Sequence, residues 1–187
     1  MATEVSICSN ALRKLGDDPI TSLSENSERA RLCNAFYAST RDAVLRAHPW
    51  NFATVRQTLN KLTSVPAFDY AAEFTLPSDP YCVRVLSMDY PDYEFKIEGR
   101  KLLTDYDEAK ILYIARITDT AEFDPLFTEA LTARLSAELA YSITGSNTLS
   151  QQMWQTYESK ISEARSIDGL EGSMEGLISN TFTAFRG

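Results

Sequence analysis

Histidine is almost missing from this chain: His48 is the single one among 187 residues. One histidine allows at most one Ser–His or Cys–His pair, and His48 stands beside Pro49 rather than in a nucleophile-elbow pattern. A lone histidine at the end of a helix most often serves the fold, with its ring hydrogen-bonded to the backbone. We therefore interpret His48 as a structural residue.

Cysteine is also scarce. Cys8, Cys33 and Cys82 lack the short spacing of a metal site, and three thiols cannot all pair with one another. Cys8 and Cys33 fall on apolar helix faces, where a thiol acts as a small hydrophobic group. No glycine-rich phosphate loop or dinucleotide fingerprint occurs. The sequence predicts no metal site and no cofactor.

The chain has no long apolar run and no block of positive charge. A membrane-spanning helix needs about 20 apolar residues, and a signal peptide needs a basic and an apolar region, which the first residues lack. We expect no membrane contact and assembly in a cytoplasm. Lys and Arg number 18 against 26 Asp and Glu, for a net charge of −8. This balance disfavours tight DNA binding and suits a wall past which DNA slides.

Helical periodicity is what the sequence does contain at both ends. Apolar residues recur at helical spacing over about 3–15 and 27–47, and again after Asp124-Pro125, an N-cap followed by a proline at the first helical position. Gly145 ends this third helix, and a fourth runs to about Asp168. Residues 1–50 and 122–168 are predicted to form an antiparallel helical bundle.

Residues 51–121 follow a different pattern. Prolines 66, 77, 80 and 91 exclude a long helix, and Phe95 and Ile97 alternate with charged residues, as in a strand with one solvated face. Gly99 marks a hairpin turn. We predict an α+β fold in which residues 51–121 form a small antiparallel β-sheet region inserted between the second and third long helices. The whole of 1–168 is then one domain.

The stretch from His48 to Phe52 joins the two patterns. Pro49 ends the preceding helix, and Trp50 and Phe52 supply two large apolar side chains at alternate positions. We predict a structural corner made by His48, Pro49, Trp50 and Phe52.

Residues 169–187 are predicted to form a flexible C-terminal tail. Three glycines interrupt the helical pattern there, yet apolar residues continue at Leu177, Ile178, Phe182 and Phe185. Such a tail folds back on its own core, frays, or docks on a partner. The number of apolar residues favours docking.

Carboxylates gather in two predicted turns, Asp17-Asp18 and Asp105-Tyr-Asp107-Glu108. A hydrolase needs carboxylates that converge from rigid elements, whereas charges in turns are usually solvated. The residues therefore predict a scaffold without an active site, and not an enzyme.

Several stretches, in a fixed order, resemble the head-to-tail adaptor family of short-tailed bacteriophages, which includes tail tubular protein A, also called the gatekeeper. The matching stretches are Ala11-Leu-Arg-Lys-Leu-Gly16, Ile20-Thr-Ser-Leu23, Arg41-Asp-Ala-Val-Leu45, His48-Pro-Trp-Asn-Phe-Ala53, Leu76-Pro-Ser-Asp79, Ile97-Glu-Gly-Arg100 with Leu102 and Thr104, Phe123-Asp-Pro-Leu-Phe127 and Leu139-Ala-Tyr141. The resemblance covers about residues 5–165, and the corner at His48 is its most specific part.

The resemblance implies a structural virion protein in the neck of the particle. Family members form a ring, here expected to hold twelve copies, between the portal protein and the tail tube or nozzle protein. Double-stranded DNA passes through the ring without tight binding. Leu177, Ile178, Phe182 and Phe185 are the residues we expect to dock on the portal.

Two other functions remain open. Some phage adaptors have been credited with cell-wall hydrolysis, so a lytic virion enzyme is one alternative. The other is a non-viral helical interaction protein. An assay on peptidoglycan separates the first from a scaffold, and gene neighbourhood separates the second.

Overall fold

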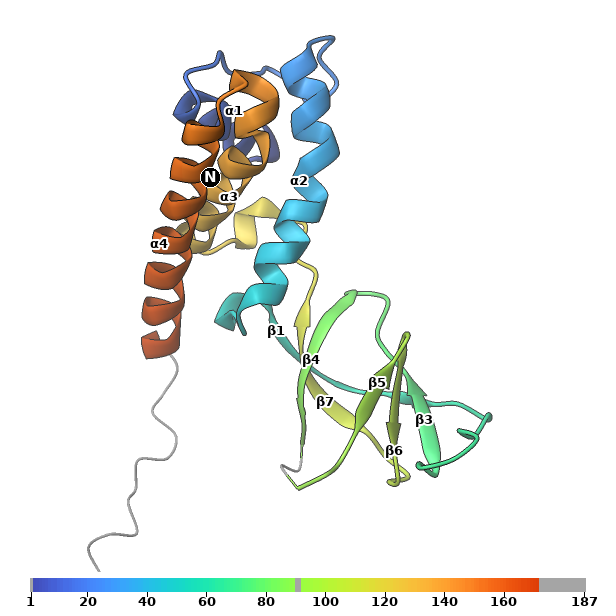
Figure 1. Ribbon diagram of the computed structural model, residues 1–187. Helices are drawn as coiled ribbons and strands as arrows, with labels where there is room; N and C mark the ends of the chain where they lie inside the picture. The colour runs from blue at the N-terminus through green and yellow to red at the C-terminus, as the bar shows by residue number, and fades with distance from the viewer. Residues whose placement is uncertain (1, 90–91, 172–187) are drawn as a thin grey trace, which may run out of the picture.

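The computed structural model describes residues 2–89 and 92–171, which form two joined parts (Figure 1). One part is helical and the other is built from strands. In chain order the elements are α1 (Glu4–Lys14), α2 (Glu28–Ala47), the 3-10 turn η1 (Asn51–Ala53), β1 (Thr54–Thr58), β2 (Asn60–Lys61), β3 (Ala72–Thr75), β4 (Cys82–Met88), β5 (Lys96–Glu98), β6 (Lys101–Thr104), β7 (Lys110–Ala115), the 3-10 turn η2 (Thr120–Glu122), α3 (Pro125–Thr144) and α4 (Asn147–Glu171).

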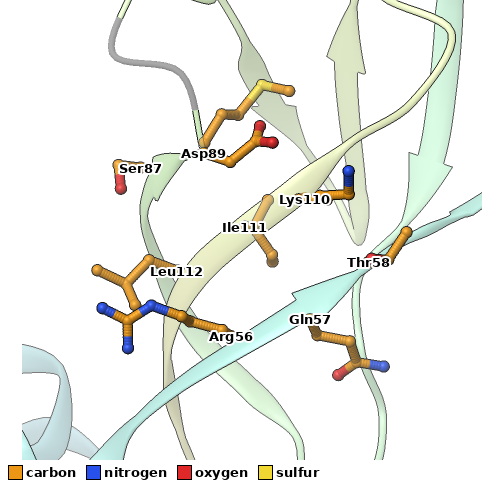
Figure 2. A pocket seen from close by; sticks show the side chains of 9 residues that line it. Arg56, Gln57, Thr58, Ser87, Asp89, Lys110, Ile111 and Leu112 are labelled. Carbon is orange, nitrogen blue, oxygen red and sulfur yellow. The ribbon is translucent and has the colours of Figure 1, made fainter.

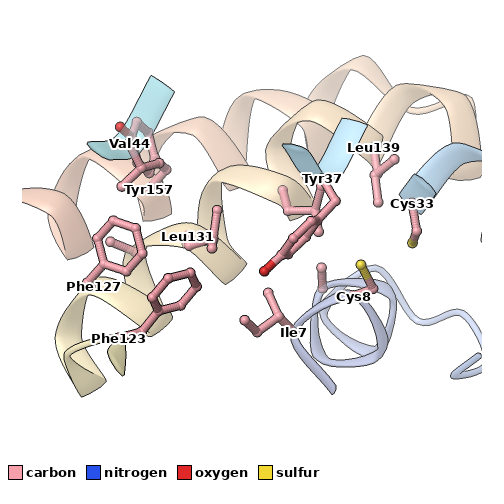
Figure 3. Close-up of a cluster of buried hydrophobic side chains, with 14 of the residues drawn as sticks. Ile7, Cys8, Cys33, Tyr37, Val44, Phe123, Phe127, Leu131, Leu139 and Tyr157 are labelled. Carbon is pink, nitrogen blue, oxygen red and sulfur yellow. The ribbon is translucent and has the colours of Figure 1, made fainter. Parts of the chain in front are cut away.

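Helix α3 is the centre of the helical part, and α1, α2 and α4 all pack against it. Its buried residues lie on more than one face, among them Phe127, Leu131, Leu135 and Leu139, as the two apolar rows of its sequence predict. Figure 3 shows this core, where Ile7 from α1 and Tyr157 from α4 join the side chains of α3. Burial of α3 on several sides makes it the structural axis of this part.

The strands form two antiparallel sheets. β1, β7 and β4 make a three-stranded sheet in the order β1-β7-β4, and the other strands make a four-stranded sheet in the order β2-β3-β6-β5. The chain passes from one sheet to the other at Leu59, which is buried and donates its N–H to the Ala109 carbonyl. Phe74 and Leu102 from one sheet share a hydrophobic core with Ile111 and Tyr113 from the other.

The predicted architecture, an antiparallel helical bundle carrying one small antiparallel β-sheet region, is wrong. The part of the chain that the structure describes holds four α-helices and two antiparallel sheets, and the sheets enclose a core of their own. The physical reason is that alternation tells which face of a strand is solvated but not which strands pair. Leu59, the single residue between β1 and β2, marks the point where the chain leaves one sheet and enters the other, and the sequence pattern carries no sign of this division.

Strand β7 connects the two cores. Ile114 belongs to the helical core, whereas its neighbours Tyr113 and Ala115 belong to the core between the sheets. Because successive side chains of a strand point to opposite faces, one strand contributes to both. The helical part and the sheets are thus packed together through β7 and not only joined by linkers.

Several local predictions are confirmed at the ends of elements. Asp124 caps α3 by accepting the N–H groups of Leu126 and Phe127, and Pro125 is its first residue. Gly145 ends α3 in the left-handed conformation, with φ 66°, and Gly99 turns the β5–β6 hairpin with φ 58°. Over the residues described, no helix combines the length and the apolar character that crossing a membrane requires.

Candidate functional site

The corner from His48 to Phe52 lies where α2 ends and β1 begins. His48 leaves the helical conformation with φ −148° and ψ 150°, because the proline that follows disfavours helix at the preceding residue. Trp50 is fully buried, and its indole Nε1 donates to the Val44 carbonyl at 2.9 Å. Its ring packs edge-on against Phe127 of α3, with the ring centres 5.2 Å apart. The corner therefore attaches α2 to the central helix.

Asp168, near the end of α4, binds this corner through three hydrogen bonds. Its Oδ2 lies 2.9 Å from His48 Nε2, its Oδ1 accepts the Asn51 backbone N–H at 3.1 Å, and its carbonyl accepts Asn51 Nδ2 at 2.6 Å. Because the side chain of Asp168 is only 8% exposed, water competes little for these bonds. We call the set formed by His48, Asn51 and Asp168 the corner clasp.

The corner clasp corrects one detail of the prediction for His48. A histidine at the end of a helix is expected to bond to the backbone there, whereas the partner of this ring is the carboxylate of Asp168. A carboxylate only accepts, so Nε2 of His48 carries the proton in this contact. Across residues 2–89 and 92–171, Asp168 is the one side chain to which His48 hydrogen-bonds, and its ring also packs edge-on against Trp50 with the centres 4.8 Å apart. The imidazole is occupied in joining α2 to α4.

The carboxylates that the sequence places in turns lie in two separate parts of the molecule. Asp17 and Asp18 follow α1, and both pair with Arg29 at 3.7 and 3.6 Å. Asp107 follows β6 in the sheets and pairs with Lys61 at 2.7 Å. Two nearby groups also have partners: Asp105 accepts the Ala71 N–H, and Glu108 pairs with Lys110. These carboxylates do not converge on one point, and each is held by a positive group or an amide.

A third polar cluster was missed by sequence reasoning. Glu73 on β3 is buried, with 7% of its side chain exposed, and it accepts a short hydrogen bond from Ser64 and a bond from Lys101 Nζ at 2.9 Å. The Ser64 hydroxyl, and then Lys101, lower the pKa of Glu73 below its ordinary value. The signal available in the sequence is a glutamate between two apolar residues, Ala72 and Phe74. The structure shows that all three positions are buried.

A hollow of about 580 Å³ lies against the three-stranded sheet. Figure 2 shows its lining: Arg56, Gln57 and Thr58 come from β1, Lys110 and Leu112 from β7, and Ser87 and Asp89 from β4 and its end. The side chains of Arg56 and Asp89 lie at opposite ends of it. Its charged groups thus do not meet at one point, as they would around a substrate atom.

The thiols are all buried. Cys8 on α1 and Cys33 on α2 lie side by side in the helical core (Figure 3), and Cys82 lies in the core between the sheets. The hydrogen-bonded Cys33 thiol and burial raise the pKa of Cys8 far above its ordinary value. The expectation that Cys8 and Cys33 act as small hydrophobic residues is confirmed. Within the described ranges, no three metal-ligating side chains gather around one point.

The predicted docking residues Leu177, Ile178, Phe182 and Phe185 lie outside the residues that the structure describes. α4 itself continues through Gly169 to Glu171, past the predicted start of the tail. Its last exposed apolar residue in the described range is Leu170, which is 80% exposed.

No protein-family model matches this chain, and no curated protein sequence matches it either.

Proposed function

We propose that this chain is a structural virion protein, a head-to-tail adaptor whose copies form a ring between the portal protein and the tail tube or nozzle protein. The observation that carries the proposal is the use made of the most specific resembling stretch, His48-Pro-Trp-Asn-Phe-Ala53. Three residues of this stretch hold parts of the fold together: His48 and Asn51 bind α4, and Trp50 binds α2 and α3. A stretch used in this way favours a scaffold over a catalyst.

The charge of the chain supports the same function. Twelve copies of −8 each carry −96 formal charges in total. A channel of that sign repels the DNA backbone, so the genome is not retained as it passes. In this proposal the residues that dock on the portal are Leu177, Ile178, Phe182 and Phe185, which follow the end of α4.

Reconstitution with portal-bearing heads tests the proposal. Purified full-length chain is mixed with DNA-filled heads that carry a portal but no tail, and the products are imaged by electron microscopy. We expect a ring of density below the portal, with twelve-fold symmetry on averaging. A chain that leaves the heads bare at micromolar concentration contradicts the proposal. A version ending at Glu171 is the matched variant: it keeps all described helices and removes the proposed docking residues.

The two alternatives have separate readouts. A turbidity or zymogram assay on purified peptidoglycan detects lytic activity, and a positive result favours the virion enzyme. Genes for portal, capsid and tail proteins beside the gene of this chain favour the adaptor. Their absence favours a non-viral interaction protein.

A further inference from the structure

A second cavity, of about 410 Å³, lies where the end of α2 meets β4 and the β5–β6 turn. Three arginines line it and come from three different elements: Arg46 from the last turn of α2, Arg84 from β4 and Arg100 from the turn. Three positive side chains at one cavity stand out in a chain whose net charge is −8. Their convergence comes from the packing of α2 on β4 and is not visible in the sequence.

Hydrogen bonds to the main chain fix the three guanidinium groups. Arg100 donates from Nη1 to the Cys82 carbonyl at 2.7 Å and from Nη2 to the Pro77 carbonyl. Arg46 donates to the Val83 carbonyl, and Arg84 donates to the Arg46 carbonyl at 3.4 Å. A break in the β4–β7 register between Cys82 and Arg84 accompanies this arrangement. Bulges of this kind redirect side chains and often lie beside functional sites.

The three arginines of the cavity carry positive charge that no ion pair offsets in the described part of the chain. Within residues 2–89 and 92–171, no carboxylate forms an ion pair with Arg46, Arg84 or Arg100. Other arginines do find partners: Arg116, for example, lies 2.7 Å from Asp42. Each guanidinium has five N–H groups and uses only one or two of them on carbonyls, so donors remain free for a ligand.

Two neighbouring groups show how closely the charges gather. The ring of Tyr81 lies between Arg100 and Arg116, whose guanidinium carbons are 4.0 and 4.1 Å from its centre. Burial raises the pKa of Cys82, and Arg100 and Arg46 both act against that rise, so both charges lie near this one thiol. Like charges held together in this way repel one another and are stabilised by a bound anion.

We propose that this cavity binds a phosphate group. Three arginines supply a charge of +3, which suits a phosphate monoester or inorganic phosphate, with a charge near −2, better than a single carboxylate. The flat fork of a guanidinium also matches the oxygens of a phosphate, with two parallel hydrogen bonds. Because the acidic chain has no extended basic stripe, the site takes one phosphate group and does not follow a DNA backbone. The proposal does not rest on the adaptor function.

Calorimetric titration of the full-length chain with inorganic phosphate, at constant ionic strength, tests the proposal. Arg84→Gln and Arg46→Gln are the informative variants because both side chains are exposed in the free protein. We expect saturable binding with one phosphate per chain, weakened at least about tenfold in either variant. Arg56→Gln removes an exposed arginine from the other cavity and is the matched control, expected to leave the affinity unchanged.

The source of the phosphate is decided by a second arm. A short duplex DNA with 5′-phosphate ends is compared with the same duplex bearing 5′-hydroxyl ends, each as a competitor of inorganic phosphate. Competition by the phosphorylated duplex alone assigns the site to a terminal phosphate of DNA, and competition by neither assigns it to free phosphate. Three results overturn the proposal. The first is the absence of saturable phosphate binding, and the second is a loss of affinity in Arg56→Gln as large as in Arg84→Gln and Arg46→Gln. The third is binding of a glutamate-rich peptide at the same arginines with no binding of phosphate. Thermal unfolding without phosphate verifies that each variant is folded.

Discussion

His48 and Asp168 are 120 positions apart in the chain, and their side chains meet at 2.9 Å. The first ends α2 and the second lies in the last turns of α4, so this contact closes the helical part at the end nearest the sheets. Asn51 binds the same aspartate through both its backbone and its side chain. Since β1 begins only three residues later, the position of α4 is coupled to the start of the first sheet.

The first prediction concerns this corner clasp. Asp168→Ala removes the acceptor of the His48 Nε2–H and of the Asn51 backbone N–H, while Asn51 Nδ2 keeps the Asp168 carbonyl. We expect a loss of about 2–3 kcal/mol in the free energy of unfolding, since hydrogen bonds to a charged group contribute about 1.5–3 kcal/mol. Urea unfolding measures it. The control is Glu158→Ala on the exposed face of α4, expected to change stability by less than about 0.5 kcal/mol. Equal stability of the two variants would show that the carboxylate of Asp168 contributes nothing.

The second prediction concerns Trp50. Trp50→Ala removes a fully buried ring that packs on Phe127 and should cost about 3–5 kcal/mol. Trp50→Phe keeps most of the apolar volume and loses the bond to the Val44 carbonyl, so its cost should be clearly smaller. Chemical unfolding followed by circular dichroism ranks the two. If both variants unfold at the same denaturant concentration, packing of the indole is not what holds the corner.

The position of Trp50 could be predicted from the sequence, but the role of Asp168 could not. Pro49 forces a break in the helix, and a tryptophan directly after a break needs a place to be buried. Asp168, however, continues the stripe of Tyr157, Ile161 and Ala164, all buried on α4. A polar residue at the next position of an apolar stripe is the signal that was present. On its own the pattern predicts that the helix ends near Asp168, because the partners of this residue are 117 and 120 positions away.

The division into two sheets could not be predicted for a similar reason. Turns and caps depend on a few neighbouring residues, so Gly99, Asp124 and Gly145 were placed correctly. The pairing of strands depends on distant partners, such as Thr54 opposite Ile114 and Ala72 opposite Thr104. The arginine cavity has the same origin, since its three side chains come from α2, β4 and a turn. Contacts of this range are set by tertiary packing, which no local pattern records.

The third prediction is a pH dependence caused by Glu73. Ser64 and Lys101 hold its pKa below the ordinary value in the folded chain, so the unfolded chain takes up the proton at higher pH. The stabilisation is therefore complete above the unfolded pKa of about 4.3 and disappears as the pH falls below it. Glu73→Gln should be less stable than the original chain at pH 7, with the difference shrinking below about pH 4. Urea midpoints across this range measure it.

The control for that experiment is Glu98→Gln. Glu98 pairs with Lys96 in the same sheet at 3.0 Å, but both side chains are more than half exposed. An exposed pair contributes little, so the stability of this variant should follow that of the original chain at every pH. A gap between Glu73→Gln and the original chain that stays constant down to pH 3 would contradict the prediction.

The fourth prediction concerns the three thiols. Cys8, Cys33 and Cys82 are buried, and only a thiolate reacts readily with a disulfide reagent. In the native chain all three should react with DTNB at least about tenfold more slowly than in urea, where the yield should reach three thiols per chain. Rapid labelling of one thiol under native conditions would mean that one of the two cores opens easily. Mass spectrometry of the labelled peptides then identifies which.

The last prediction is weak binding of duplex DNA. A protein that holds DNA tightly neutralises many phosphates with Lys and Arg, whereas this chain carries −8 and gathers three arginines at one cavity. One phosphate contact per chain gives little affinity, and the net negative charge of the chain opposes the approach of a polyanion. In a fluorescence anisotropy titration at physiological salt, we expect a dissociation constant weaker than micromolar for a blunt duplex. Because few counterions are released, the affinity should also depend only weakly on salt concentration. Sub-micromolar affinity with a steep salt dependence would mean that the chain grips the backbone along its length. A ring of such chains would retain DNA instead of letting it pass.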